Sequence, residues 1–211
     1  AGAATGCAIQ SFTTVATGCY CASVPTSNDG TGITNATVGS TPFVIADVMY
    51  ANNTATAIAV EPGTNTNVQL TFATGYTYDI NVWIDFNNDF DFNDAGELVK
   101  TGIACTTANP NTVDASFLMP VTAPTGAHRM RIGTADSGQV TPNPCYSGSF
   151  GVTLDFTVQV NPMPTDTPDW VNLQWPYSAT ILAGNSETIY AQIYEGGLTD
   201  TTSGQAAGIE A

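Results

Sequence analysis

The sequence YTYDINVWID at residues 76–85 decides the fold class. Its even-numbered positions are apolar or aromatic, whereas Thr77, Asp79, Asn81 and Asp85 stand at odd-numbered positions. A period of two is typical of a β-strand, because successive side chains of a strand point to opposite faces. The preceding tripeptide, ATG at residues 73–75, predicts a hairpin turn that joins this strand to the one before it.

Residues 86–97, FNNDFDFNDAGE, place a dense set of oxygen ligands directly after this strand. Ca²⁺ takes about 6–8 oxygen ligands, and no lysine or arginine interrupts the run. Without a cation the carboxylates would repel one another in a partly desolvated turn. We therefore expect one structural Ca²⁺, with a backbone carbonyl or a water molecule completing a ligand set of Asp85, Asn87, Asp89, Asp91 and Glu97.

The match of this loop to the EF-hand consensus is partial. Phe90 stands where the consensus has glycine, and Glu97 falls one place beyond the consensus glutamate. We therefore expect a calcium loop without the EF-hand helix pair. The alternative is a solvated acidic turn that holds no ion.

Further strand candidates follow one another at intervals of roughly ten residues, which is typical of a β-sandwich. No apolar stripe of helical period exceeds two turns, so helix should be nearly absent. The pattern predicts an all-β, antiparallel sandwich. Its strand candidates are residues 33–38, 43–50, 57–60, 67–72, 76–85, 98–103, 112–119, 128–135 and 152–160.

The charge balance excludes several classes of partner. The chain has a formal net charge of −15, and its only strong bases are Lys100, Arg129 and Arg131. Nucleic acid and anionic membrane surfaces both require a basic footprint, so neither is an expected partner. No apolar run approaches the ~20 residues that span a bilayer, which argues against direct membrane insertion.

Five cysteines occur without a CxxC pair or neighbouring histidines. This pattern argues against zinc and for disulfides formed in an oxidising compartment. Cys19 and Cys21 would lie on the same face of an extended segment, so each should find a different partner. The odd number leaves one cysteine over, either as a buried thiol or paired with a residue outside this chain.

The chain divides into four parts by composition. Residues 1–20 form an N-terminal arm, 21–160 the sandwich, 161–168 a proline-rich linker and 169–211 a second unit. The linker is stiff and cannot continue a central strand. The second unit offers three strand candidates, at residues 169–174, 179–182 and 187–195. Three strands cannot close a sandwich, so we expect 169–211 to be a partial β-module.

Several motifs together resemble the GEVED domain. They occur in the order and spacing of that family over roughly residues 20–160. In this sequence they read YC at 20–21, VWIDFN at 82–87 with Asp89, Asp91 and AGE at 95–97, RMR at 129–131, PC at 144–145, and GVTLDFTV at 151–158.

The resemblance implies a module of secreted or surface proteins of Bacteroidota. Residues 170–211 similarly resemble the opening of a β-module found in large extracellular proteins of the same bacteria, many of which are exported by the type IX system. We therefore expect a secreted or cell-surface location with type IX export. In the motif that names the family, Val152 and Leu154 replace both glutamates, while Gly151 and Asp155 remain.

The resemblance also implies particular contacts. Cys21 and Cys145 stand at the two ends of the family pattern, which predicts a disulfide between them. Cys7 would then pair with Cys19 and leave Cys105 unpaired. Asp155 could contribute to the calcium site from a neighbouring strand, as a secondary ligand.

The chemistry argues against an enzyme. His128 is the only histidine and stands beside Arg129, where we expect it at the surface near a strand end. No nucleophile elbow is present, and a metal accounts for the clustered acids better than glycoside hydrolysis does. Arg129 and Arg131 point to one face of a strand, and we expect a structural ion pair with an acid such as Asp155.

These observations predict a non-catalytic, calcium-stabilised, disulfide-bonded module of a larger secreted or cell-surface protein, with a role in adhesion, display or spacing. Its partner would be the remainder of that protein or another surface protein. The alternative is an accessory module of an extracellular hydrolase that binds glycan or protein substrate. Solvent-exposed, coplanar aromatic side chains in a groove would favour this alternative, and their absence would favour the scaffold role.

Overall fold

The computed structural model describes residues 18–163, 170–176 and 178–194. The chain divides into two units, Ala1–Met163 and Pro164–Ala211. Every regular element in the described residues is a strand, so the predicted all-β fold is confirmed. Most of the expected arm and linker, and the end of the second unit, lie outside the described residues.

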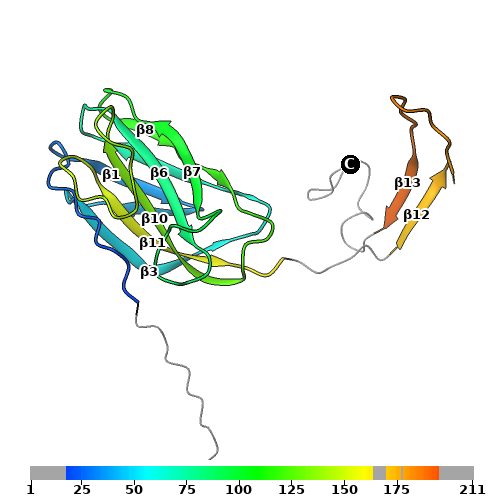
Figure 1. Cartoon of the computed structure of the whole chain (residues 1–211), viewed down its shortest axis with the longest axis horizontal. Coiled ribbons are helices and arrows are strands. Elements are labelled where there is room, and N and C mark those ends of the chain that lie inside the picture. Colours follow the sequence, from blue (N-terminus) through cyan, green and yellow to red (C-terminus); the bar gives the residue numbers. More distant parts are fainter. Residues whose placement is uncertain (1–17, 164–169, 177, 195–211) are drawn as a thin grey trace, which may run out of the picture. The chain divides into compact units, whose positions relative to one another are not determined.

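The first unit is a sandwich of two sheets (Figure 1). Its strands are β1 (Ile33–Val38), β2 (Thr41–Val44), β3 (Tyr50–Val60), β4 (Asn65–Thr66), β5 (Val68–Phe72), β6 (Tyr78–Asp85), β7 (Leu98–Ala104), β8 (Asn111–Asp114), β9 (Phe117–Leu118), β10 (Gly126–Asp136) and β11 (Thr153–Val160). One sheet has the order β2-β1-β5-β8, the other β3-β11-β10-β6-β7, and β4 pairs with β9.

The apolar core lies between the two sheets. Val38 and Leu70 from the first sheet and Ile84, Met130 and Leu154 from the second are fully buried in it. Within the second sheet all pairings are antiparallel except β11 with β3. The even-numbered residues of β6, β10 and β11 face the core, as the alternation in residues 76–85 predicts.

The predicted hairpin turn at residues 73–75 is wrong. β5 pairs with β1 and β8, whereas β6 lies between β10 and β7 in the other sheet. The turn therefore carries the chain across the sandwich. The rings of Phe72 and Tyr78, on either side of it, stack across the core with centroids 6.1 Å apart.

Two other strand predictions were too long. The predicted strand at residues 43–50 is interrupted, since β2 ends at Val44 and β3 begins at Tyr50. The predicted strand at 112–119 divides into β8 and β9, because Ser116 turns the backbone away: its amide donates to the Asp114 carboxylate, and its hydroxyl accepts the Val68 amide.

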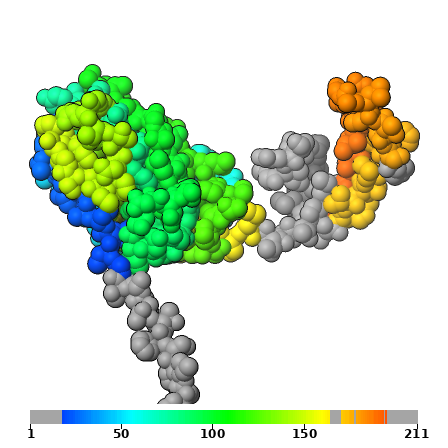
Figure 2. All heavy atoms as spheres, in the orientation of Figure 1, coloured from blue at the N-terminus to red at the C-terminus, as the bar shows by residue number. Residues whose placement is uncertain are grey.

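The outer face of the five-stranded sheet is also covered. Asn81, Trp83 and Asp85 lie on this face and are buried. Residues 18–26 run across it beside the loop 137–150, with which they form hydrogen bonds such as Thr26 N–H to Gly148 O (3.0 Å). Figure 2 shows the two segments side by side, in blue and yellow-green. The polar side of β6 is therefore internal.

The second unit, as far as it is described, is one antiparallel hairpin of β12 (Trp170–Trp175) and β13 (Tyr190–Tyr194). The predicted strand at residues 179–182 is wrong: these residues are exposed and have no strand beside them in the described residues. A hairpin alone is marginally stable in water. How the second unit is completed therefore stays a prediction.

Candidate functional site

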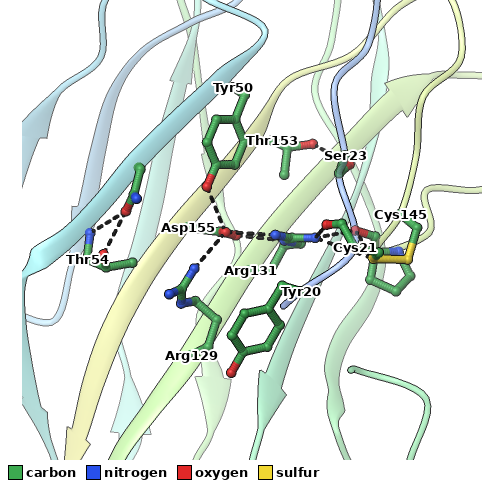
Figure 3. A network of polar contacts seen from close by, with 12 residues as sticks. Tyr20, Cys21, Ser23, Tyr50, Thr54, Arg129, Arg131, Cys145, Thr153 and Asp155 are labelled. Carbon is green, nitrogen blue, oxygen red and sulfur yellow. Dashed lines mark hydrogen bonds and ion pairs between the residues drawn. A yellow bond between two sulfur atoms is a disulfide. The ribbon is translucent and has the colours of Figure 1, made fainter. Parts of the chain in front are cut away.

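The outer face of the five-stranded sheet centres on one buried carboxylate, that of Asp155 on β11 (Figure 3). Arg131 on β10 grips it with two parallel hydrogen bonds, Nε to Oδ1 and Nη2 to Oδ2, both 2.7 Å long. Arg129 Nη1 and the Tyr50 hydroxyl each donate to Oδ2 at 3.0 Å. The predicted ion pair between the arginines and Asp155 is therefore confirmed.

Arg131 also binds the segments that cover this face. Its Nη1 donates to the carbonyl oxygens of Cys21 (2.9 Å) and Pro144 (2.7 Å). The predicted Cys21–Cys145 disulfide is present at the same place, with the two Cα atoms 5.5 Å apart. One guanidinium and one covalent bond therefore fasten the N-terminal segment and the 137–150 loop to each other.

Tyr20 connects this network to the acidic loop. Its ring lies under the Arg129 guanidinium, 4.6 Å from the Cζ atom, and its hydroxyl donates to Asp85 Oδ2 at 2.7 Å. The same ring packs against those of Phe90 and Phe92 in the loop. The end of β6 and the start of the loop are thereby held against residues 20–21.

Asp155 does not join the loop acids. Both of its oxygens accept hydrogen bonds from the two arginines and Tyr50, and its part in the predicted calcium site stays a prediction. Val152 and Leu154, which replace the glutamates of the family motif, point to the opposite face and are buried in the apolar core. They supply no ligand.

The acidic loop at residues 86–97 winds around its own side chains. Asn87, Asp89 and Asp91 each accept, through Oδ1, the backbone N–H of the residue two places further on. Asp85 Oδ1 accepts the N–H of Asn88 at 2.6 Å. This curl arises because Asn and Asp side chains readily form such turns with their own backbone.

Phe90 adopts the backbone conformation that the EF-hand consensus reserves for glycine. Its φ is +76°, in the left-handed region that bulky residues rarely occupy. The ring contact with Tyr20 and the hydrogen bond from the Phe90 amide to Asp85 Oδ2 (3.1 Å) hold it there. Phe90 therefore has a left-handed backbone at this position, and its ring packs against Tyr20.

Two carboxylates of the predicted set are buried, Asp85 fully and Glu97 at 2% exposure. Glu97 accepts the backbone N–H groups of Phe86 (3.1 Å) and Asp94 (3.2 Å), which ties the two ends of the loop together. Burial raises the pKa of Glu97, as do the nearby carboxylates of Asp85 and Asp94. Neither Asp85 nor Glu97 has an ion-pair partner among the described residues.

The chemistry of this loop fits Ca²⁺, because it offers only oxygen donors and leaves buried negative charge without a cation. The positions of the side chains do not converge. Among the described residues, no three acidic, cysteine or histidine side chains form a group that could hold a metal ion. The ligand set therefore stays a prediction.

His128 is buried, at 3% exposure, and not at the surface as expected. Its Nδ1 lies 3.1 Å from Asp85 O and its Nε2 lies 2.8 Å from Pro124 O. The Phe86 ring meets the imidazole edge to face. His128 lies on the core-facing side of β10, near the start of the strand, and its imidazole links the acidic loop to the turn that precedes β10.

The remaining cysteines are only partly described. Cys19 is exposed and Cys105 buried, and neither forms a disulfide with another described residue. Cys105 Sγ accepts the Tyr78 amide and donates to Tyr76 O, which suits a structural thiol. The predicted Cys7–Cys19 pair depends on Cys7, which lies outside the described residues.

Residues 79–159 match the family model of the GEVED domain. This match confirms the predicted resemblance for this part of the chain. The match runs from β6 to β11 and so contains the acidic loop, both arginines and Asp155, and it is shorter than the expected 20–160. GEVED domains are regarded as extracellular β-modules without catalytic activity. No curated protein matches the chain.

Replacing Asp155 by Asn should strongly destabilise the GEVED domain. The variant leaves Arg131, whose side chain is 3% exposed, without its counter-charge. Removing one partner of a buried pair costs about 3–5 kcal/mol. Urea unfolding measures the loss, with Glu187→Gln, an exposed acid of the second unit, as the control that should change little.

A double-mutant cycle separates the charge pair from simple packing. The double variant Asp155→Leu with Arg131→Met should cost less than the sum of the single variants, because no buried charge is left unpaired. Additive losses in this cycle would contradict the assignment of Asp155 and Arg131 as a coupled pair.

The domain should lose stability in alkali. Tyr20, Tyr50 and Tyr78 each donate to a carboxylate, those of Asp85, Asp155 and Asp29 respectively. Burial and then the carboxylate raise the pKa of each phenol. The folded pKa of each phenol lies above its unfolded value of about 10. The contribution of each phenol–carboxylate hydrogen bond to folding stability is therefore complete below pH ~10, and it is lost as the pH rises through the folded pKa.

Absorbance at 295 nm and circular dichroism against pH would test this. Tyr20→Phe should make the alkaline unfolding curve shallower, whereas Tyr76→Phe, at an exposed position, should not change it. Identical curves for the Tyr20 variant and the native chain would exclude the phenol–carboxylate pair as a source of the pH dependence.

Proposed function

We propose that this chain is part of a larger secreted or cell-surface protein, in which its GEVED domain is a non-catalytic, calcium-stabilised module for adhesion, display or spacing. The observation that carries this is the pair of buried carboxylates, Asp85 and Glu97, which have no cationic partner in the described residues. They stand at the two ends of a loop that belongs to an extracellular type of module.

The proposed ion would be held by Asp85, Asn87, Asp89, Asp91 and Glu97, with a backbone carbonyl or water. Bound Ca²⁺ would supply the positive charge that the loop lacks. The contacts that support this proposal are the curl of the loop and the glycine-like backbone of Phe90. The loop side chains would have to turn toward a common centre on binding.

The position of His128 supports a non-catalytic role. Both ring nitrogens face carbonyl oxygens, and the imidazole is buried against Phe86. A serine or cysteine nucleophile requires a base within hydrogen-bond reach. The only histidine of the chain therefore serves the fold.

The location proposed is extracellular, with export by the type IX system. The disulfide between Cys21 and Cys145 supports an oxidising compartment. In the described residues, no helix has the length and the apolar character needed to pass through a bilayer. The partner proposed is the remainder of the larger protein or another surface protein.

Removing calcium should lower the melting temperature. Extracellular modules commonly bind Ca²⁺ with a Kd of about 10⁻⁴–10⁻³ M. Free calcium at roughly 100 times Kd would add about 2.7 kcal/mol to the folding stability. Melting curves in calcium and in EGTA measure this, and limited proteolysis should show cleavage within residues 85–97 only in EGTA.

Asp89→Ala should abolish the difference between calcium and EGTA, because it removes an exposed loop ligand without opening the core. Asp114→Ala, outside the loop, should keep that difference. If the native chain, shown to be metal-free in EGTA, melts at the same temperature in both solutions, the loop is an acidic turn without an ion.

A glycan-binding role is the second candidate, and the second unit favours it. Trp170 and Tyr194 are cross-strand neighbours, and Tyr190 lies on the same side of β13; all three are about half exposed. Asn172 and Gln192 lie between them. Aromatic rings with flanking amides suit a sugar, whose ring stacks while its hydroxyls form hydrogen bonds.

Titration with soluble polysaccharides, followed by tryptophan fluorescence, tests this candidate. Binding that is lost in Trp170→Ala, and kept in a matched exposed variant such as Leu182→Ala, would favour the accessory role over the scaffold role. No saturable change with any polysaccharide would remove it.

A further inference from the structure

A groove of about 400 Å³ lies between the acidic loop and the turn that leads into β10. This volume falls within the range of small-ligand sites, about 300–1,000 Å³. Its apolar lining comes from Phe86 and Ala95 on the loop side and from Pro120, Ala123 and Pro124 on the turn side. None of the contacts described above for the outer face uses this space.

The two walls are held in place without a ligand. Glu97 ties the two ends of the loop through the amides of Phe86 and Asp94. The imidazole of His128 spans from Asp85 O, next to Phe86 of one wall, to Pro124 O in the other wall. A preformed site saves part of the ordering cost of binding.

The polar side of the groove is acidic. The Asp94 carboxylate is exposed there, and its one hydrogen bond in the described residues comes from Asn87 Nδ2 (2.5 Å). No lysine or arginine lines the groove. Of the three strong bases in the whole chain, Arg129 and Arg131 form ion pairs with Asp155. The groove therefore complements a cation.

We propose that this groove binds an arginine side chain of a partner polypeptide. The apolar stem would lie along Phe86 and Pro124, and the guanidinium would pair with Asp94. Arginine suits the site better than lysine, because its planar fork pairs with a carboxylate and stacks on aromatic rings. This domain uses the same combination internally, where Arg131 lies over the Phe92 ring and grips Asp155.

The inference rests on the proposed function only in that a surface module engages other polypeptides. It does not require the calcium ion: Asp94 is outside the proposed ligand set, and only its hydrogen-bond partner Asn87 belongs to that set. Asp94 can therefore be changed without removing a proposed ligand or a buried group.

The experiment is an NMR titration of the full ¹⁵N-labelled chain with the capped tripeptide Ala-Arg-Ala. The matched probe is Ala-citrulline-Ala, which has the same shape and no charge. We expect saturable shifts at the amides of Gly96 and Ala123, and at least about tenfold weaker binding of the citrulline peptide. Asp94→Asn should weaken binding of the arginine peptide by a similar factor. Glu187→Gln, at an exposed acid in the other unit, should leave this binding unchanged.

The titration is run in calcium and in EGTA, with melting curves of the same samples. Equal melting in both solutions removes the calcium proposal and leaves the groove untouched. The groove proposal is overturned if the shifts lie elsewhere, if they do not saturate, or if both peptides bind equally. The comparison of the two peptides on the native chain decides the matter even where Asp94→Asn fails to fold.

Discussion

The bidentate pair between Arg131 and Asp155 is the interaction on which the outer half of this domain depends. A charged pair buried at 2% and 0% exposure contributes little net stability by itself, because both ions lose their hydration. Its value here is geometric. The remaining nitrogen of Arg131 reaches two carbonyl oxygens, those of Cys21 and Pro144, which come from opposite ends of the domain sequence. The disulfide closes at the same point.

Much of this arrangement follows from local patterns. The alternation in residues 76–85 is that of β6, and the spacing of Arg129 and Arg131 on one face predicts their shared carboxylate. The disulfide came from the family pattern. Local patterns do not show whether other segments of the chain cover a face of a sheet. Asn81 and Asp85 read as the solvent side of their strand, and the long-range packing of residues 18–26 and 137–150 covers that side, through contacts such as Tyr20 with Asp85 and Pro142 with Asn81. His128 lies on the core-facing side of β10, where Phe86 and Pro124 contact it.

The same limit explains the error at residues 73–75. A short glycine-containing turn between two alternating strands is the signal of a hairpin. The sheet that the second strand joins depends on the strands with which it pairs. β6 pairs with β7 and β10, which both come later in the chain. For the candidate site the chemistry of the donors could be predicted from the sequence. The bracing of the loop by Tyr20 and His128 could not, since neither lies near the loop in sequence.

The position of the disulfide also determines how this domain would respond to mechanical tension. A pull applied between Tyr20 and Asn161 reaches the covalent bridge at Cys21 at once and passes through it to Cys145. Residues 22–144, with most of both sheets, lie outside the path of the force. Only residues 146–160 can lengthen, and β11 at their end is hydrogen-bonded on both sides, to β10 and β3. The domain would therefore act as a nearly inextensible link.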